Sequence, residues 1–104
     1  MKFSMISSQK EMKQSIQISD NVTDIMKLPC IFGAWKYPYV PNSSREKYPV
    51  RGHQPKEGDI IYDFRQGWRS DFAMKGDWLL EHENGTWEII SNEDHEYAVK
   101  KGFL

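Results

Sequence analysis

The side chains best suited to binding lie in one segment rich in aromatic and basic residues, residues 33–55. These side chains are Trp35, Tyr37, Tyr39, Arg45, Lys47, Tyr48, Arg51 and His53. An aromatic ring can stack on a nucleobase, and an arginine can hold a phosphate through two hydrogen bonds. Tyrosine, tryptophan and arginine also dominate the energetic centres of protein–protein interfaces. The segment is therefore predicted to be a binding loop or insertion; the alternative is that its rings cover a small core.

The other reactive side chains indicate chemistry less clearly. Four aspartates lie near the ends of predicted strands and could gather as a carboxylate site, namely Asp59, Asp63, Asp71 and Asp77. Acid–base catalysis also needs a shifted pKa, which a sequence does not reveal. The histidines His53, His82 and His95 are too scattered for the spacing of metal ligands. We therefore predict no catalytic residue, no metal and no cofactor, and we interpret Cys30 as a buried apolar thiol.

Length and composition limit the class of protein. A chain of 104 residues is expected to form one small domain, 1–104, with a modest core. Its formal net charge of −1 argues against nucleic acid as a partner. One cysteine excludes an internal disulfide and favours the cytoplasm. No apolar run is long enough to cross a bilayer and no signal peptide is recognised, so no membrane association is expected.

A β-hairpin over residues 76–90 is the clearest structural signal in the chain. Asn84-Gly85 between two runs of strand-forming residues predicts a two-residue turn with positive φ at both positions. In that register Glu81 faces Glu88 on a solvated surface, where two carboxylates could also hold a cation. The opposite, core-facing side carries Trp78, Leu80, His82, Trp87 and Ile89. This hairpin is interpreted as the scaffold of the fold.

Weaker patterns predict the other strands and two helices. Strands 60–64 and 68–72 are joined by a three-residue loop, Arg65-Gln66-Gly67, which pairs Phe64 with Trp68 and Asp63 with Arg69. Alternating polar and apolar residues predict a strand over 14–19.

Asp20-Asn21 offers the N-cap of a predicted helix over about 21–28, which Pro29 ends, and Ser91 caps a second over about 92–101, for which Gly102 is the C-cap candidate. The fold is therefore predicted to be α+β, with an antiparallel, strongly bent or barrel-like β meander of four to six strands and two short helices.

Several short motifs give the chain a resemblance to a group of small uncharacterised phage and prophage proteins. The matching pieces are Ser15-Ile16-Gln17-Ile18, Asp20-Asn21-Val22, Gly76-Asp77-Trp78-Leu79-Leu80, Gly85 and residues 93–97. The middle of the chain departs from that pattern, because residues 35–55 resemble an insertion. The resemblance implies a phage or prophage accessory protein working in the host cell cytoplasm, and no activity is carried over from the group, because it has no established chemistry.

Three hypotheses of function follow from these patterns. The first is a binding protein that engages a host protein, for example to inhibit a host defence, or another copy of itself through the aromatic segment. The second is a binder of a small nucleotide-like molecule, held between an aromatic ring and an arginine. The third is a small enzyme that uses the strand-end aspartates.

Overall fold

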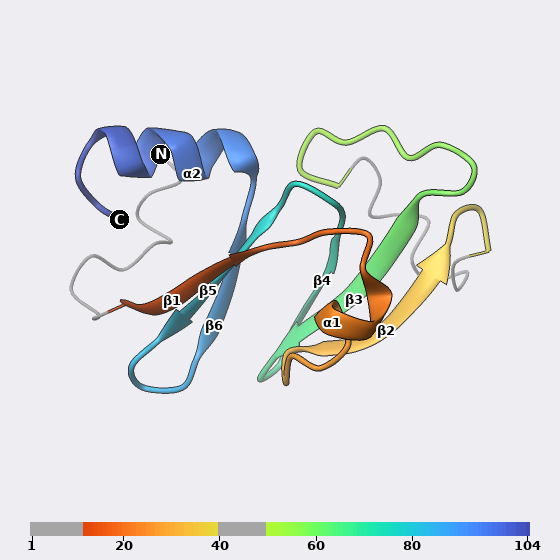
Figure 1. Ribbon diagram of the computed structural model, residues 1–104. Coiled ribbons are helices and arrows are strands. Elements are labelled where there is room, and N and C mark those ends of the chain that lie inside the picture. Colours follow the sequence, from red (N-terminus) through yellow and green to blue (C-terminus); the bar gives the residue numbers. More distant parts are fainter. Residues whose placement is uncertain (1–11, 40–49) are drawn as a thin grey trace. The chain divides into compact units, whose positions relative to one another are not determined.

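A computed structural model describes residues 12–39 and 50–104, which divide into two compact units (Figure 1). The described part of unit 1 is residues 12–17 and 76–104, and that of unit 2 is residues 18–39 and 50–75. The elements are β1 (Met12–Gln17), α1 (Val22–Ile25), β2 (Ile31–Lys36), β3 (Ile60–Gln66), β4 (Arg69–Ala73), β5 (Trp78–His82), β6 (Trp87–Ile90) and α2 (Asn92–Lys100). All strand pairs are antiparallel. The predicted α+β class with antiparallel strands and two short helices is confirmed.

The predicted β meander is divided between two separate sheets. Unit 1 holds a sheet in the order β1-β5-β6, and unit 2 holds a sheet in the order β2-β3-β4. The chain leaves β4 through a turn at Gly76, whose φ is 98°, and β5 then pairs with β1 rather than with β4. Among the described residues the strands therefore form two hairpins in two sheets, and no closed barrel is found.

Unit 1 buries an apolar cluster between its sheet and α2. Leu80 of β5, Ile90 of β6 and Ala98 of α2 form this cluster, and Met12 and Trp78 pack against it. Of the predicted core residues, Leu80, His82 and Trp87 are buried, whereas Trp78 and Ile89 are half-buried. Leu79 and Ile90, which the predicted register placed on the other face, are buried as well. Both faces of the sheet thus carry buried apolar side chains.

The register of the β5–β6 hairpin differs by one residue from the predicted one. Glu81 pairs with Trp87, and Leu80 pairs with Glu88. Because side chains alternate between the faces of a strand, Glu81 and Glu88 lie on opposite faces of the sheet. The predicted pair of facing carboxylates, and with it the suggested cation site, is therefore wrong.

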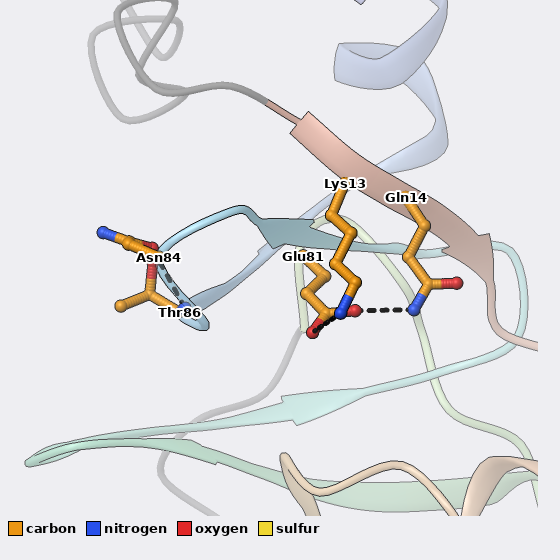
Figure 2. Close-up of polar contacts among 5 residues, drawn as sticks. All are labelled: Lys13, Gln14, Glu81, Asn84 and Thr86. Atoms are coloured by element: carbon orange, nitrogen blue, oxygen red, sulfur yellow. Dashed lines mark hydrogen bonds and ion pairs between the residues drawn. The ribbon is translucent and has the colours of Figure 1, made fainter.

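The hairpin loop explains the change of register. The loop is Glu83-Asn84-Gly85, since the amide of His82 donates to the carbonyl of Thr86 at 2.9 Å. A two-residue turn would need positive φ at both Asn84 and Gly85, and only Gly85 has it, at 86°. The Asn84 side chain instead accepts hydrogen bonds from the Thr86 amide (3.1 Å) and hydroxyl (2.7 Å), as Figure 2 shows. These bonds stabilise the three-residue loop.

Glu81 is held by β1 rather than left to solvent. Gln14 lies directly opposite Glu81 in the sheet and donates from Nε2 to its carboxylate at 2.6 Å. The ammonium of Lys13 lies 3.8 Å from the other carboxylate oxygen, and both side chains reach Glu81 from β1 in Figure 2. Glu81 therefore helps to join the N-terminal strand to the centre of the sheet.

Helix α2 has the ends that its sequence predicts. The hydroxyl of Ser91 accepts from the amide of Asp94 at 3.0 Å, which caps the N-terminus. At the other end the Phe103 amide donates to the Ala98 carbonyl at 2.8 Å, and Gly102 has a φ of 81°. This is the Schellman arrangement in which glycine satisfies the last carbonyls of a helix. The predicted N-cap at Ser91 and C-terminal glycine are confirmed.

Unit 2 carries apolar side chains on both faces of its sheet. One face holds a buried cluster of Val50, Ile61, Phe72 and Met74. On the other face Tyr62 and Phe64 are buried, and the Tyr62 hydroxyl donates to the carbonyl of Ser19 at 2.9 Å. That hydrogen bond ties the segment leading into α1 to the sheet.

Helix α1 is shorter than the predicted helix over 21–28. Of the two N-cap candidates Asp20 and Asn21, it is the Asn21 side chain that caps the helix, by accepting from the Asp24 amide at 3.2 Å. Beyond Ile25 the bonds tighten, because the Leu28 amide donates to Ile25 at 3.1 Å, three residues back. Pro29 disfavours the helical conformation at the residue before it, which accounts for the early end.

The β3–β4 turn differs from the predicted one and places a tryptophan outside the core. Gln66 pairs with Arg69, so Gly67 and Trp68 form a two-residue turn in place of the predicted Arg65-Gln66-Gly67 loop. Gly67 has a φ of 60°, as a type II′ turn requires at its first central position. The predicted pairing of Phe64 with Trp68 is therefore wrong.

Candidate functional site

The aromatic segment chosen from the sequence is partly a strand. Residues 33–36 belong to β2, and Trp35 and Tyr37 pack as partly buried side chains against the unit 2 core cluster. Tyr39 is 79% exposed. The predicted binding residues Arg45, Lys47 and Tyr48 lie outside the described residues. For Trp35 and Tyr37, the structure thus supports the alternative that the rings cover a small core.

Arg51 is committed to contacts within unit 2. It has a φ of 43°, and its guanidinium donates to the carboxylate of Asp71 at 2.8 Å and to the carbonyl of Phe72. Only 15% of its side chain is exposed. Asp71 and Phe72 lie on β4, which is an edge strand of the sheet. Arg51 therefore attaches its own turn, residues 50–53, to that edge, and these contacts occupy donors that a phosphate would need.

His53 lines a small polar cleft in unit 2. The cleft has a volume of about 270 Å³. Its other lining residues are Asp20, Asp59, Ile60, Met74 and Lys75. The Lys75 ammonium lies 3.7 Å from the Asp20 carboxylate, and one oxygen of Asp59 accepts from the Lys56 amide at 2.9 Å. Two carboxylates and one ammonium give the cleft a negative balance, which opposes a phosphate group.

The negative charge of Asp20 at this cleft contributes to a raised pKa of the Tyr62 phenol. Burial, and after it the negative charge of Asp20, raises the pKa of Tyr62 to about 12. The phenol is consequently neutral over the physiological range and acts as a hydrogen-bond donor to Ser19.

The strand-end aspartates do not gather as a catalytic or metal site. Asp63 bonds to Arg65 and Asp71 bonds to Arg51, while Asp77 is fully buried in unit 1. Within residues 12–39 and 50–104, no group of three or more His, Cys, Asp or Glu side chains could hold a metal ion. Cys30 is buried, as predicted.

The most exposed large hydrophobic side chain among the described residues is Trp68, which the sequence had paired with Phe64. Its relative exposure is 94%, against 0–6% for the buried core residues. It makes no ring contact or side-chain hydrogen bond with the described part of the chain. The signal that could have found it is Gly67 directly before it, because Gly-X is the preferred pair for a type II′ hairpin turn.

An arginine and a second aromatic ring lie close to Trp68. The Arg65 guanidinium lies over the Phe32 ring, 5.3 Å from its centroid, and also bonds to the Asp63 carboxylate at 3.0 Å. Phe32 is 59% exposed and lies in β2, which begins at the end of the sheet where the β3–β4 turn lies (Figure 1). Arg69 follows Trp68 and is exposed. We call Phe32, Arg65, Trp68 and Arg69 the Trp68 tip.

Unit 1 contains two polar clusters that the sequence did not reveal. His82 is fully buried, with Nε2 2.5 Å from a Glu88 carboxylate oxygen and Nδ1 without a hydrogen-bond partner among the described residues. The Trp78 indole stacks on His95, with ring centroids 3.7 Å apart, and donates to the Asn92 side chain at 2.9 Å. The observed register of the β5–β6 hairpin brings Glu88 to the face of His82, and the packing of α2 on the sheet brings His95 and Asn92 to Trp78.

The stacked histidine has an altered pKa. Burial lowers the pKa of His95 from its ordinary value of 6.5, and the neighbouring Glu96 carboxylate only partly opposes this effect. The neutral imidazole is therefore the form that burial of His95 favours.

No family model matches the chain, and comparisons with curated proteins and with solved structures give no match either. None of the helices in the described ranges is long and apolar enough to cross a membrane.

Proposed function

We propose that this chain is a small non-enzymatic binding protein that engages a protein partner through the Trp68 tip. The observation that carries the proposal is the 94% exposure of Trp68 on a hairpin turn. Leaving a tryptophan in water forgoes the burial of a large apolar surface, which is worth roughly 2–3 kcal/mol for a side chain of this kind. Buried tryptophans and arginines are also the residues that contribute most to protein–protein binding energy.

The resemblance to small phage and prophage proteins supports a biological setting for this proposal. The partner would be a host protein in the host cytoplasm, such as a component of a host defence, and binding would inhibit it. A second copy of this chain is the alternative partner. Sedimentation velocity separates the two, because self-association through the tip would make the sedimentation coefficient depend on concentration and on Trp68.

A pull-down from a bacterial lysate with quantitative mass spectrometry tests the proposal. Trp68→Ala should abolish partner recovery while the variant stays folded, since the ring contributes no contact to the described fold. Tyr39→Ala is the matched control, because Tyr39 is also exposed, at 79%, but lies near the opposite end of the unit 2 sheet. Loss of recovery with Tyr39→Ala and not with Trp68→Ala would move the binding surface to the aromatic segment.

The cleft supports a second candidate function, the binding of a small molecule. Its volume of about 270 Å³ is slightly below the range typical of ligand pockets, so only a compact ligand fits. The charges of Asp20 and Asp59 favour a small amine over a nucleotide. A ligand of the folded state should raise the melting temperature, so a thermal-shift screen with short aliphatic amines and nucleoside phosphates tests this function. Stabilisation by the phosphates and not by the amines would contradict the charge argument.

A further inference from the structure

We infer that the partner presents carboxylates around an apolar pocket that receives the Trp68 ring. This inference rests on the proposed function, because it names the chemistry of the surface that the Trp68 tip would bind. It follows from three features of the tip: a projecting aromatic ring, a fixed guanidinium and a second exposed arginine.

Trp68 is placed to enter a pocket rather than to lie against a flat surface. The turn contains only Gly67 and Trp68, because Gln66 and Arg69 already pair in the sheet. Apart from its two chain neighbours, no described residue has an atom within 4 Å of the position that a Cβ would take at Gly67, so the turn projects into open space. Tryptophan has only two side-chain torsions, so little conformational entropy is lost when its ring is fixed in a partner. The ring therefore suits the role of an anchor.

Arg65 is already oriented before any partner binds. Its Nε and one terminal nitrogen lie 3.1 Å and 3.0 Å from the same oxygen of Asp63, and the guanidinium lies over the Phe32 ring. Asp63 is only 7% exposed, so the arginine also neutralises a buried carboxylate. The Arg65 side chain nevertheless stays 55% exposed. Its outward N–H groups are thus available to an acceptor on a partner, at a reduced cost in conformational entropy.

Arg69 adds a positive charge on the other side of the hairpin. Arg65 pairs with Ser70, and Arg69 pairs with Gln66, so the two arginine side chains leave opposite faces of the sheet. The Arg69 side chain makes no hydrogen bond or ion pair within the described ranges. The nearby carboxylates are already used, Asp63 by Arg65 and Asp71 by Arg51. The tip therefore carries one uncompensated positive charge, at Arg69, and on the other face the outward N–H groups of the paired Arg65; acidic side chains complement both.

Peptide display on the full chain tests this inference. A library of random 12-residue peptides is selected on the immobilised wild-type protein, with counter-selection on Trp68→Ala. The expected peptides carry aspartate or glutamate on both sides of an apolar cluster. Their affinity should fall about tenfold with Arg69→Glu and fall further as the salt concentration is raised from 50 to 300 mM. Lys56→Glu is the matched control, since this exposed lysine precedes the start of β3, at the other end of the sheet, and should leave the affinity unchanged.

The outcomes separate the inference from the proposed function. Peptides that need Trp68 but carry no acidic residues, or that bind Arg69→Glu as well as wild type, would overturn the acidic-partner inference and leave the binding function intact. Failure of every peptide pool to depend on Trp68 would overturn the proposed function itself. Labelled single-stranded DNA and RNA homopolymers form a parallel arm, and binding of these that requires Trp68 and Arg69 would replace the acidic protein surface with nucleic acid.

Discussion

Replacing Tyr62 by phenylalanine should change how the unfolding free energy responds to alkaline pH. The Tyr62 side chain is fully buried, and its hydroxyl donates to the Ser19 carbonyl at 2.9 Å. Burial and the Asp20 charge raise the pKa of Tyr62 from its ordinary value of 10.0 to about 12. The folded state therefore holds the phenolic proton more tightly than the unfolded chain. The contribution of this proton to the unfolding free energy is complete below pH 10 and is lost as the pH rises to about 12.

The size of the effect follows from the two pKa values. A tyrosine that ionises at pH 10.0 when unfolded and at about 12 when folded costs the wild type roughly 1.4 kcal/mol at pH 11. The phenylalanine variant lacks that ionisation and loses one hydrogen bond, worth about 1 kcal/mol at neutral pH. The variant should therefore be about 1 kcal/mol less stable than wild type at pH 7 and equal or slightly more stable at pH 11.

Urea unfolding followed by tryptophan fluorescence between pH 7 and pH 11 measures this difference. Tyr39→Phe is the control, because the Tyr39 side chain is 79% exposed and removal of its hydroxyl should leave the response of the unfolding free energy to pH unchanged. Asp20→Asn should weaken the alkaline loss, since it removes the charge that contributes to the raised pKa of Tyr62. A difference between wild type and Tyr62→Phe that stays constant from pH 7 to pH 11 would refute the reasoning.

Three other changes have expected outcomes. Burial lowers the pKa of His95 in the folded state, so the unfolded chain takes up the proton first as the pH falls through 6.5. Wild type should therefore lose stability between pH 7 and pH 5 relative to His95→Gln. Unfolding free energies from urea titrations that change with pH in parallel for the two proteins would exclude the effect. In Gly33→Ala, the new methyl group would lie 2.8 Å from the Trp35 ring. A loss of about 1–3 kcal/mol in unfolding free energy is therefore expected. An unfolding free energy equal to that of wild type would mean that the ring moves freely. Asn84→Ala removes both bonds to Thr86 and should lower the midpoint of thermal unfolding by a few degrees; an unchanged midpoint in calorimetry would show that Gly85 alone determines the loop.

The helix ends and the apolar strands were predictable because they depend on local chemistry. Ser91 and Asn21 cap their helices through the backbone amide three residues ahead, a contact that needs no tertiary information. Gly102 has the positive φ that its place after a helix predicts. The strand segments around residues 60–64 and 78–82 were likewise found from their residue types.

The registers and the sheet membership were not predictable from the same patterns. Asn84-Gly85 is compatible with a two-residue and a three-residue loop, and a difference of one residue decides whether Glu81 faces Glu88 or Trp87. Likewise Gly67 can end a three-residue loop or begin a two-residue turn, and that choice decides whether Trp68 is in the core or at the tip. The pairing of β1 with β5 is set by tertiary packing, which local preference does not encode.

The candidate site, like the fold, was only partly predictable from residue types. Trp35, Tyr37 and Arg51 were chosen for their residue types, yet two of them pack around the core and the third holds a strand edge. Residue type alone cannot separate a ring that covers a core from one that meets a partner, because both roles favour the same side chains. Exposure separates them, and exposure depends on the register that places Trp68 on a turn.

Strands β1 and β5 pair although unit 2 separates them in the sequence, and this has a consequence for the order of folding. Met12 pairs with His82 and Gln17 with Trp78, so the whole sequence of unit 2 separates two strands that pair with each other. Closing a flexible loop of about 60 residues costs roughly 3.6 kcal/mol in chain entropy. Unit 2 is continuous in sequence, and the Lys75 ammonium and the Asp20 carboxylate near its ends lie 3.7 Å apart.

A folded unit 2 would therefore bring β1 and β5 together before they pair. The docking of β1 is therefore expected to follow the folding of unit 2, because the entropy of closing the long loop would otherwise slow this long-range pairing. Substitutions in the core of unit 2 should consequently slow the folding of unit 1, even though the two sheets share no strand.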